Sequence, residues 1–255
     1  MSRVALITGA ARGIGFATAK RFVREGWNVA VVDIDDAELD VAAKELPGAL
    51  MIHGDISSQD SINHFIGLAE KEFGRLDALV NNAGVADFGP MEETTFERWR
   101  HVMTTNLDGI FLTSQAALPL MKRTSREEGG AIVNIASISG LRASTLRVAY
   151  GTSKAAVVQL TLQQAAELGE FNIRVNAVAP GPVRTKLAMA VHSKEIIEAY
   201  HDAIPLNRYG TETELANAIW FLSSPEASYI TGQCLAVDGG FEGTGIGLPA
   251  LRASK

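Results

Sequence analysis

The sequence predicts an α/β fold: a doubly wound parallel sheet of about seven strands with helices on both faces. Short runs rich in Val, Ile and Ala alternate along the chain with longer segments of helical periodicity. The runs are apolar at successive positions, which is typical of parallel strands that helices cover on both sides. With 255 residues, 47% of them hydrophobic, the chain can form one large core, and we expect a single domain over residues 1–255.

The strands and helices follow one another in regular order. The predicted strands are Val4–Thr8, Asn28–Asp33, Ala49–His53, Ala78–Val80, Ala131–Ser137, Arg174–Ala179 and Cys234–Val237. The predicted helices are Ile14–Glu25, Ala37–Glu45, Gln59–Phe73, Phe96–Lys122, Tyr150–Leu168 and Glu212–Leu222. Two loose regions are expected, Thr124–Gly130 and Pro182–Pro205, and the tail from Gly239 is expected to be irregular. The second region is either a loop that covers a ligand or an ordinary long surface connection.

Composition excludes several classes of protein. The formal charge of −6 and the pI of about 5.4 disfavour binding to nucleic acid and to an anionic membrane surface. Cys234 is the one cysteine, so no disulfide can form within the chain, as is usual in a reducing cytoplasm. No uncharged stretch reaches membrane-spanning length, and the five histidines lack metal-ligand spacing. We therefore expect a cytoplasmic protein without a metal.

A glycine-rich turn follows the first predicted strand and reads Thr8-Gly9-Ala10-Ala11-Arg12-Gly13-Ile14-Gly15. Glycine lets the backbone approach a pyrophosphate closely, and the next helix supplies free N–H groups and the positive end of its dipole. The spacing is Gly-x-x-x-Gly-x-Gly, not the commoner Gly-x-Gly-x-x-Gly fingerprint. An ordinary tight turn would fit the same letters, but the position between strand and helix favours a dinucleotide site.

An acidic residue closes the second predicted strand. Asp33 follows Val29-Ala30-Val31-Val32 and lies eighteen positions after the last glycine of the turn. A carboxylate there accepts hydrogen bonds from the adenosine ribose of NAD and repels the extra phosphate of NADP. Arg12 could instead reach that phosphate, but two further aspartates lie just after Asp33. A solvated strand-end aspartate is the structural alternative, and we expect NAD.

A second group of residues has the pattern of a proton-transfer site. Tyr150 and Lys154 lie one turn apart on one face of a predicted helix. A phenol with a pKa of about 10 is a poor base, but a nearby ammonium stabilises the phenolate and lowers that pKa. Tyr-x-x-x-Lys alone is common and usually a surface pair. Ser137, thirteen residues before Tyr150, strengthens the prediction because its hydroxyl could hold a substrate oxygen from the other side.

In the order and spacing of these motifs the chain resembles the short-chain dehydrogenase/reductase family over essentially its full length. The matching features are the Thr-Gly-x-x-x-Gly-Ile-Gly turn, Asn81-Asn82-Ala83-Gly84, Asn106, the set Ser137, Tyr150 and Lys154, and Pro180-Gly181. The resemblance implies a Rossmann-like fold and an NAD-dependent oxidoreductase that transfers a hydride to or from the carbon of a secondary alcohol or ketone. One departure is Ala136, where the family often has a second serine.

The resemblance also implies a role for each residue. Tyr150 would exchange a proton with the substrate oxygen, Ser137 would orient that oxygen, and Lys154 would lower the tyrosine pKa and bind the nicotinamide ribose. Asn106 would hold a water that relays protons to solvent, or it would only bond a neighbouring carbonyl. The implied cofactor-binding residues are Gly9, Arg12, Gly13, Ile14, Gly15, Asp33, Asp55, Ile56, Asn82, Ala83, Gly84, Tyr150, Lys154, Pro180, Gly181, Val183 and Thr185. Asp55 would meet the adenine or merely cap a loop.

Other residues follow the motifs and border the site in the family. They are Asp87, Phe88, Leu141, Arg142, Arg147, Leu187, Met189 and His192. Arg142 and Arg147 would suit a carboxylate-bearing substrate, and solvated loop charges are the alternative. Relatives commonly pair two long helices between subunits, so we expect a homotetramer or a dimer. The apolar tail Gly245–Leu251 could reach a neighbouring subunit.

Two other functions remain open. The first is an NADP-dependent 3-oxoacyl-type ketoreductase, for which Lys122, Arg123 and Arg126 offer a small basic patch toward an acidic carrier protein. Asp33 and the net charge disfavour it. The second is a non-catalytic NAD-binding regulatory protein, which would not need an activated phenol. The substrate, the stereochemistry and the direction of the reaction depend on loop shapes that motifs do not fix.

Overall fold

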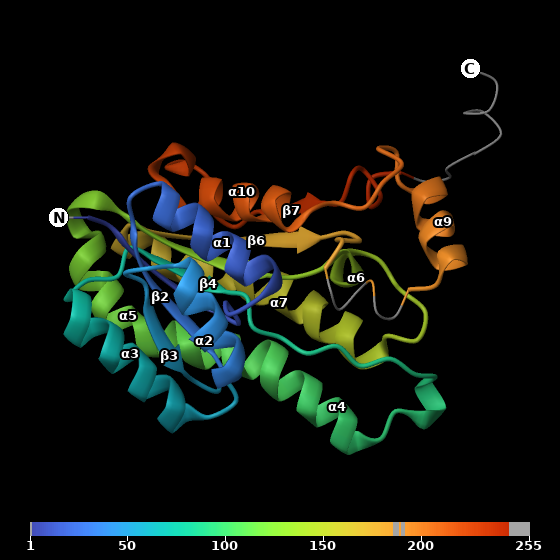
Figure 1. The fold of residues 1–255 in the computed structure, drawn as a ribbon, viewed down its shortest axis with the longest axis horizontal. Coiled ribbons are helices and arrows are strands. Elements are labelled where there is room, and N and C mark those ends of the chain that lie inside the picture. The colour runs from blue at the N-terminus through green and yellow to red at the C-terminus, as the bar shows by residue number, and fades with distance from the viewer. Residues whose placement is uncertain (1, 186–188, 190–191, 245–255) are drawn as a thin grey trace.

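Seven parallel strands form one sheet in the order β3-β2-β1-β4-β5-β6-β7, which confirms the predicted fold class (Figure 1). The computed structural model describes residues 2–185, 189 and 192–244. The strands are β1 (Val4–Thr8), β2 (Asn28–Asp33), β3 (Leu50–His53), β4 (Ala78–Asn81), β5 (Gly130–Ile135), β6 (Ile173–Pro180) and β7 (Cys234–Val237). Each predicted run forms a strand, with ends that differ by a few residues.

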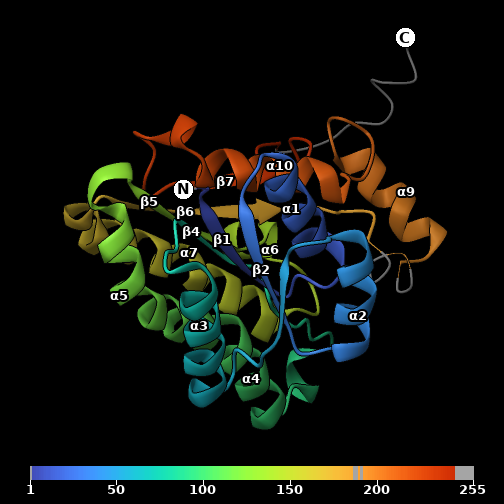
Figure 2. The same cartoon turned by 60° about the vertical axis from the view of Figure 1, so that its left-hand side comes forward.

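Helices cover both faces of the sheet (Figure 2). They are α1 (Gly13–Arg24), α2 (Asp36–Glu45), α3 (Gln59–Phe73), α4 (Phe96–Met103), α5 (Gly109–Glu128), α6 (Ile138–Leu141), α7 (Val148–Leu168), α9 (Lys194–Ala203) and α10 (Glu212–Ser223). Helices α1, α2 and α10 pack on one face, and α3, α5 and α7 pack on the other. In the described part of the chain no helix is long and apolar enough to cross a membrane.

The central strand β1 shows why the sheet is covered on both sides. All five of its residues are buried, and successive side chains point to opposite faces. Val4 and Leu6 join the core beneath α3, α5 and α7, whereas Ala5 and Ile7 join the core beneath α1 and α10. The uninterrupted apolar run therefore supplies side chains to two cores in alternation, one on each face of the sheet, as the sequence predicts.

Three predicted boundaries are wrong. The loose region Thr124–Gly130 is mostly helix, because α5 continues to Glu128. Strand β5 ends at Ile135, and Ser137 lies beyond it as the N-cap of α6. The region Pro182–Pro205 contains α9, which Ser193 caps through a bond from the Ile196 amide. The predicted helix Phe96–Lys122 is present, but it contains a π-helical segment at Thr104–Asp108.

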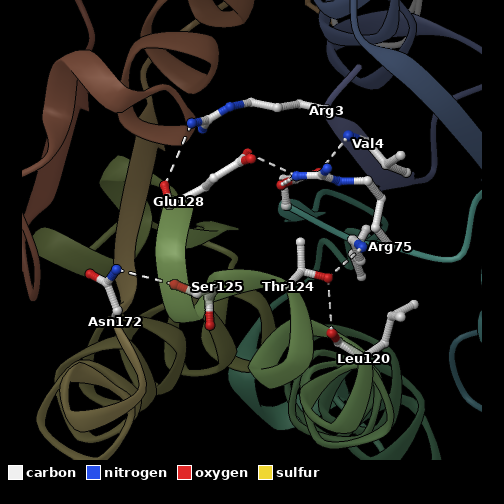
Figure 3. Close-up of polar contacts among 10 residues, drawn as sticks. Arg3, Val4, Arg75, Leu120, Thr124, Ser125, Glu128 and Asn172 are labelled. Carbon is white, nitrogen blue, oxygen red and sulfur yellow. Dashed lines mark hydrogen bonds and ion pairs between the residues drawn. The ribbon is translucent and has the colours of Figure 1, made fainter. Parts of the chain in front are cut away.

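An ion pair with a buried carboxylate, Arg75–Asp77, connects the amino ends of β1 and β4 (Figure 3). Asp77 accepts two bonds from Arg75, at 2.9 and 2.7 Å, and one from the Val4 amide at 2.8 Å. Arg75 also pairs with Glu128 at 2.9 Å, and Arg3 reaches the Glu128 carbonyl. This network joins β1, β4 and α5 at the edge of the sheet opposite the one that carries the glycine turn.

Candidate active site

The sheet changes winding direction at β1. From β1 the chain proceeds to β2 and β3 on one side, while β4 to β7 lie on the other side. In open parallel sheets, ligands bind beyond the carboxyl ends of the strands at such a switch point. The glycine turn follows β1 at this point, and Asn82 follows β4, so the two motifs meet at the carboxyl edge of neighbouring strands.

The glycine turn is shaped for close backbone approach. Gly9 has φ of +61°, and a Cβ there would lie 2.7 Å from the Ala83 Cα atom. A Cβ on Gly15 would lie 2.3 Å from the Gly9 carbonyl oxygen. Neither position tolerates a side chain without movement of the backbone. The turn thus brings the main chain of β1, α1 and the segment after β4 into direct contact.

Helix α1 presents an uncapped N-terminus beside this turn. Its N-cap, Arg12, makes no side-chain cap bond, and the first turn carries no acidic residue. Side chains do cap α2, α3, α4, α9 and α10. The amides of Gly13, Ile14 and Gly15 therefore begin a helix with no side-chain cap and no acidic residue in its first turn. This end of α1 fits the pyrophosphate of a dinucleotide.

The Asn81-Asn82-Ala83-Gly84 run supports the turn. Asn82 donates from Nδ2 to the carbonyls of Thr8 and Gly9, at 2.9 and 2.8 Å. The Thr8 hydroxyl accepts from the Asn82 and Ala83 amides, both at 3.1 Å. Asn81 turns inward and bonds Asn134 of β5 at 2.9 Å. Asn82 and Ala83 are thus bound into the scaffold of the turn itself.

The carboxylate of Asp33 faces the glycine turn. It is 8% exposed and accepts from the Ala11 amide at 3.0 Å and from the Asp35 amide at 3.2 Å. Arg12 points to other acids: it pairs with Asp35 at 2.8 Å and approaches Glu38 at 3.7 Å. The hydrogen bond to Asp35 raises the pKa of Arg12 and lowers that of Asp35. The guanidinium is thus neutralised by its own neighbours.

The predicted cofactor residues after β3 and at the end of β6 also make close contacts with their neighbours. Asp55 accepts from the amide and hydroxyl of Ser57, at 2.8 and 2.7 Å, so one of its oxygens does cap a loop. Ile56 is buried against Gly109. Beyond Pro180, the last residue of β6, the Gly181 amide donates to Val237 at 3.1 Å.

The segment after Gly181 is held by short backbone contacts. Val183 pairs with Gly210 in an isolated bridge. The Thr185 amide donates to the Val183 carbonyl at 2.8 Å. These two residues therefore lie in an ordered connection just beyond the carboxyl end of β6. Leu187 and the tail Gly245–Leu251 lie outside the described residues.

The three residues of the predicted proton-transfer group converge. Tyr150 lies in the first turn of α7, and Lys154 follows one turn later with its Nζ atom 5.8 Å from the centre of the Tyr150 ring. Ser137 is within hydrogen-bonding reach of the Tyr150 phenol. Ser137 also caps α6, accepting from the Ser139 amide at 3.1 Å. A strand end and a helix start thus bring a hydroxyl, a phenol and an amine together.

The predicted lowering of the Tyr150 pKa is wrong for the chain by itself. Burial disfavours the phenolate and raises the pKa of Tyr150 above its ordinary value of 10.0. The hydrogen bond from Ser137 and the positive charge of Arg147 oppose this effect without overcoming it. The Lys154 ammonium is directed elsewhere, donating to the Ile135 carbonyl at 2.7 Å. Burial also lowers the pKa of Lys154 to about 8.

Asn106 lies in the π-helical segment and its side chain is fully committed. Its Oδ1 atom accepts from the Val85 amide at 2.8 Å, and Nδ2 donates to the Val85 carbonyl at 2.9 Å and to Ser153 at 3.1 Å. The residue is completely buried. The Asn106 side chain thus bonds a neighbouring carbonyl, which is the alternative to a water-holding role that the sequence left open. Gly84 lies beside it, and a Cβ there would come within 3.1 Å of Oδ1.

Sequence reasoning missed an aromatic wall, formed by His192, Tyr200, Tyr209 and Phe241. His192 bonds the Tyr209 hydroxyl at 2.9 Å and stacks on Tyr200, which also meets Phe241 edge-on. The four residues are scattered over fifty positions without a shared motif, so only folding brings them together. A cavity of about 250 Å³ is lined by Met189, Tyr209 and neighbours; neither Ser137 nor Tyr150 lines it.

The chain matches known oxidoreductases over nearly its whole length. Residues 9–242 match a family model described as enoyl-(acyl carrier protein) reductase, of the short-chain dehydrogenase type. Trans-4-hydroxycyclohexanecarboxylate dehydrogenase of Sinomonas cyclohexanicum is 38% identical, with 93% of this chain and 92% of the relative covered. A 3-oxoacyl-(acyl-carrier-protein) reductase of Thermotoga maritima is 39% identical, with coverage of 93% and 97%.

Solved structures agree with this assignment. The crystal structure of 3-ketoacyl-(acyl-carrier-protein) reductase from Brucella melitensis, complexed with NADH, superposes with a TM-score of 0.89. It is 34% identical, and the match covers 94% of this chain and 98% of that one. The chain therefore belongs to the short-chain dehydrogenase/reductase family, and the relatives named here are dehydrogenases and reductases.

Proposed function

We propose that the protein transfers a hydride between NAD(H) and a secondary alcohol or ketone, with Tyr150 as the general acid and base. The observation that carries this proposal is the convergence of the Ser137 hydroxyl, the Tyr150 phenol and the buried Lys154 amine. A protein that only bound NAD would have no use for this set. The relative from Sinomonas, named for the oxidation of a secondary alcohol, supports the same substrate class.

In the proposed mechanism the substrate oxygen lies between two hydroxyls. Ser137 donates to that oxygen and fixes its position, and Tyr150 removes or returns the proton at its Oη atom. Bound nicotinamide would supply the hydride chemistry. Because the pKa of Tyr150 is raised by burial, a nearby positive charge is needed to favour the phenolate. Lys154 would supply it by turning its ammonium away from the Ile135 carbonyl.

Protons would then reach solvent through the Asn106 segment. The Asn106 side chain is occupied by Val85 and Ser153, so we assign a water-holding role to its main-chain carbonyl. The π-helical geometry at Thr104–Asp108 supports this, since such segments interrupt the regular pattern of helix hydrogen bonds. In this proposal the side chain holds the segment in place and the backbone takes part in the relay.

The residues present favour NAD over NADP. Asp33 is held toward the glycine turn, where it would accept bonds from the adenosine ribose and repel a 2′-phosphate. Arg12, the residue in the turn that could bind such a phosphate, is already paired with Asp35. Gly9, Gly13, Ile14 and Gly15 would hold the pyrophosphate, and Val183 and Thr185 would contact the nicotinamide amide.

The experiment is the reduction of NAD⁺, with NADP⁺ alongside, by wild type and Tyr150→Phe on a panel of secondary alcohols. Tyr229→Phe is the matched control, because Tyr229 is fully exposed. Turnover that disappears in Tyr150→Phe and persists in Tyr229→Phe would support the proposal. Full turnover in Tyr150→Phe would mean that another residue is the acid and base. NADH binding without turnover of any alcohol would favour the regulatory alternative.

A ketoreductase that acts on a carrier-bound 3-oxoacyl group is the second candidate. It is supported by the relative from Thermotoga and by the structure from Brucella, whose names give that activity. The basic patch expected to meet a carrier protein is weak, because Arg123 pairs with Glu70 and Lys122 lies over the Phe171 ring. Reduction of acetoacetyl-coenzyme A by NADPH at a higher kcat/KM than any alcohol oxidation would favour this candidate.

We also propose assembly into a homotetramer or dimer in the cytoplasm. Phe111 of α5 and Leu162 of α7 are large apolar side chains, 46% and 45% exposed on the two long helices. Pairing of these helices between subunits would bury them. Sedimentation of wild type and a Phe111→Asp, Leu162→Asp double variant tests the assembly, because a monomeric wild type would exclude it.

A further inference from the structure

Arg147 is held firmly at the start of α7, three residues before Tyr150. Its backbone pairs with Gly89 in an isolated bridge, and the Gly89 amide donates to the Leu146 carbonyl at 3.0 Å. Leu146 has φ of +62°, a conformation that costs free energy and persists only where the surroundings impose it. The Arg147 guanidinium lies 4.7 Å from the centre of the Phe88 ring.

Among the side chains that the structure describes, Arg147 has no counter-ion, because none of their carboxylates lies within ion-pair distance of it. The acid nearest in sequence to Phe88 is Asp87, and it is occupied by Arg98 through bonds of 2.9 and 2.6 Å. A guanidinium offers a planar fork of donors that matches a carboxylate in two parallel bonds. Arg147 is therefore a fixed cation whose natural partner is absent from the described part of the chain.

The charge of Arg147 acts on the site itself. Its guanidinium carbon lies 5.8 Å from the centre of the Tyr150 ring, and it opposes the rise in the Tyr150 pKa. The same charge adds to burial in lowering the pKa of His192, a member of the aromatic wall. Tyr150 and His192 come from distant segments, yet the charge of Arg147 acts to lower the pKa of both. Arg147 thus lies beside the Tyr150 ring, and its charge reaches as far as His192 of the aromatic wall.

We propose that Arg147 binds a carboxylate of the substrate, so that the substrate class is secondary alcohols or ketones that carry a carboxylate group. The alcohol carbon would lie at Tyr150 and Ser137, the carboxylate at Arg147, and the carbon body between them against the aromatic wall. The proposal rests on the proposed function, and it narrows the substrate class of that site. It assigns Arg147 to substrate binding and leaves proton transfer to Tyr150.

The test compares hydroxy acids with their primary amides, which have similar shape and no charge. Suitable pairs are 3-hydroxybutanoate and 4-hydroxycyclohexanecarboxylate with the corresponding amides. The readout is the ratio of kcat/KM for acid over amide, in which any effect of Arg147 on the Tyr150 pKa cancels. We expect a ratio of about 10 or more in wild type, from a charge-assisted bond. It should fall to about 1 in Arg147→Met and be partly restored in Arg147→Lys.

Arg142→Met is the comparison variant, because Arg142 is also without an acidic partner among the described residues but contacts the Phe241 ring and carbonyl. An acid-to-amide ratio that survives in Arg147→Met, or that collapses in Arg142→Met instead, would overturn the proposal.

A calorimetric titration of the enzyme–NADH complex with cyclohexanecarboxylate needs no turnover, so it separates this proposal from the proposed function. We expect binding about tenfold or more weaker in Arg147→Met than in wild type. Equal affinities would overturn the proposal even if alcohols are oxidised. A clear difference would support it even if none of the panel alcohols is a substrate.

Discussion

Gly15 and Gly67 allow one substitution to be tested in opposite environments. Both lie within helices, α1 and α3, where alanine is intrinsically favoured over glycine by about 1 kcal/mol. A Cβ on Gly67 would meet nothing within 4 Å. A Cβ on Gly15 would lie 2.3 Å from the Gly9 carbonyl oxygen and 2.5 Å from Nδ2 of Asn82. Gly15 is buried at the third position of α1 and Gly67 is exposed in the middle of α3, and a Cβ would meet the glycine turn only at Gly15.

The magnitude for Gly15→Ala follows from these contacts. Relief of the clash requires backbone movement, and overpacking of this kind costs about 1–3 kcal/mol. The same movement disturbs the two bonds from Asn82 to Thr8 and Gly9, each with a net contribution of about 1 kcal/mol. After the helix-propensity gain, we expect a loss of about 2–4 kcal/mol in the free energy of unfolding. For a chain of this size that corresponds to a Tm lower by roughly 5–15 °C.

Thermal unfolding by circular dichroism and NADH binding by fluorescence are the assays. Gly67→Ala should raise the Tm by about 1–3 °C and leave NADH affinity unchanged. Gly15→Ala should lower the Tm and weaken NADH binding, because the turn that would hold the pyrophosphate has to move. A Gly15→Ala variant that melts at the wild-type temperature and binds NADH normally would contradict the close packing of the glycine turn.

Three further predictions concern charge. Asp77→Ala removes the buried acceptor of three hydrogen bonds, two from Arg75 and one from the Val4 amide, so the free energy of unfolding should fall by about 3–5 kcal/mol in urea titrations even though Arg75 keeps Glu128. Glu45→Ala at the exposed pair with Lys20 should cost less than about 1 kcal/mol, and equal losses would contradict the importance of burial. Asp33→Ser should shift the ratio of kcat/KM for NAD⁺ over NADP⁺ toward NADP⁺ by about tenfold or more, and an unchanged ratio would remove Asp33 from cofactor selection. The depressed pKa of Lys154, about 8 against 10.5, means that the unfolded chain binds more protons between these values. Wild type should therefore gain about 2 kcal/mol of stability relative to Lys154→Met between pH 7.5 and 9.5, and a fall over this range would refute the shift.

Much of the fold was predictable because each buried parallel strand fills both of its faces with apolar side chains. Strand β1 illustrates this, since its run contributes alternately to the two cores. Helix α9 was also predictable in principle, because Ser193 is an N-cap residue before an amphipathic stretch. The π-helical segment was not, since nothing in Thr104–Asp108 marks a break in helical geometry.

The proximity of Ser137, Tyr150 and Lys154 was predictable from the sequence, whereas their electrostatics were not. The spacing of Tyr150 and Lys154 on one helix guarantees that they lie near each other. The direction of the Tyr150 pKa depends instead on how much of the phenol is buried and on where the Lys154 ammonium points. Both are set by distant strands and loops, such as the Ile135 carbonyl that the ammonium meets. That Arg147 lacks an acidic partner among the described residues likewise becomes visible only in the structure, where Arg98 occupies Asp87.

The ion-pair network at the amino ends of the strands bears on how the chain is made. Strand β1 is synthesised before its partners, because its Val4 amide bonds Asp77 and Arg3 reaches a carbonyl 125 positions further along the chain. Its neighbour β4 also emerges late from the ribosome. Strand β1 therefore completes these contacts only after α5 has been translated. We expect the segment from β1 to α3 to be the stretch that chaperones shield during synthesis.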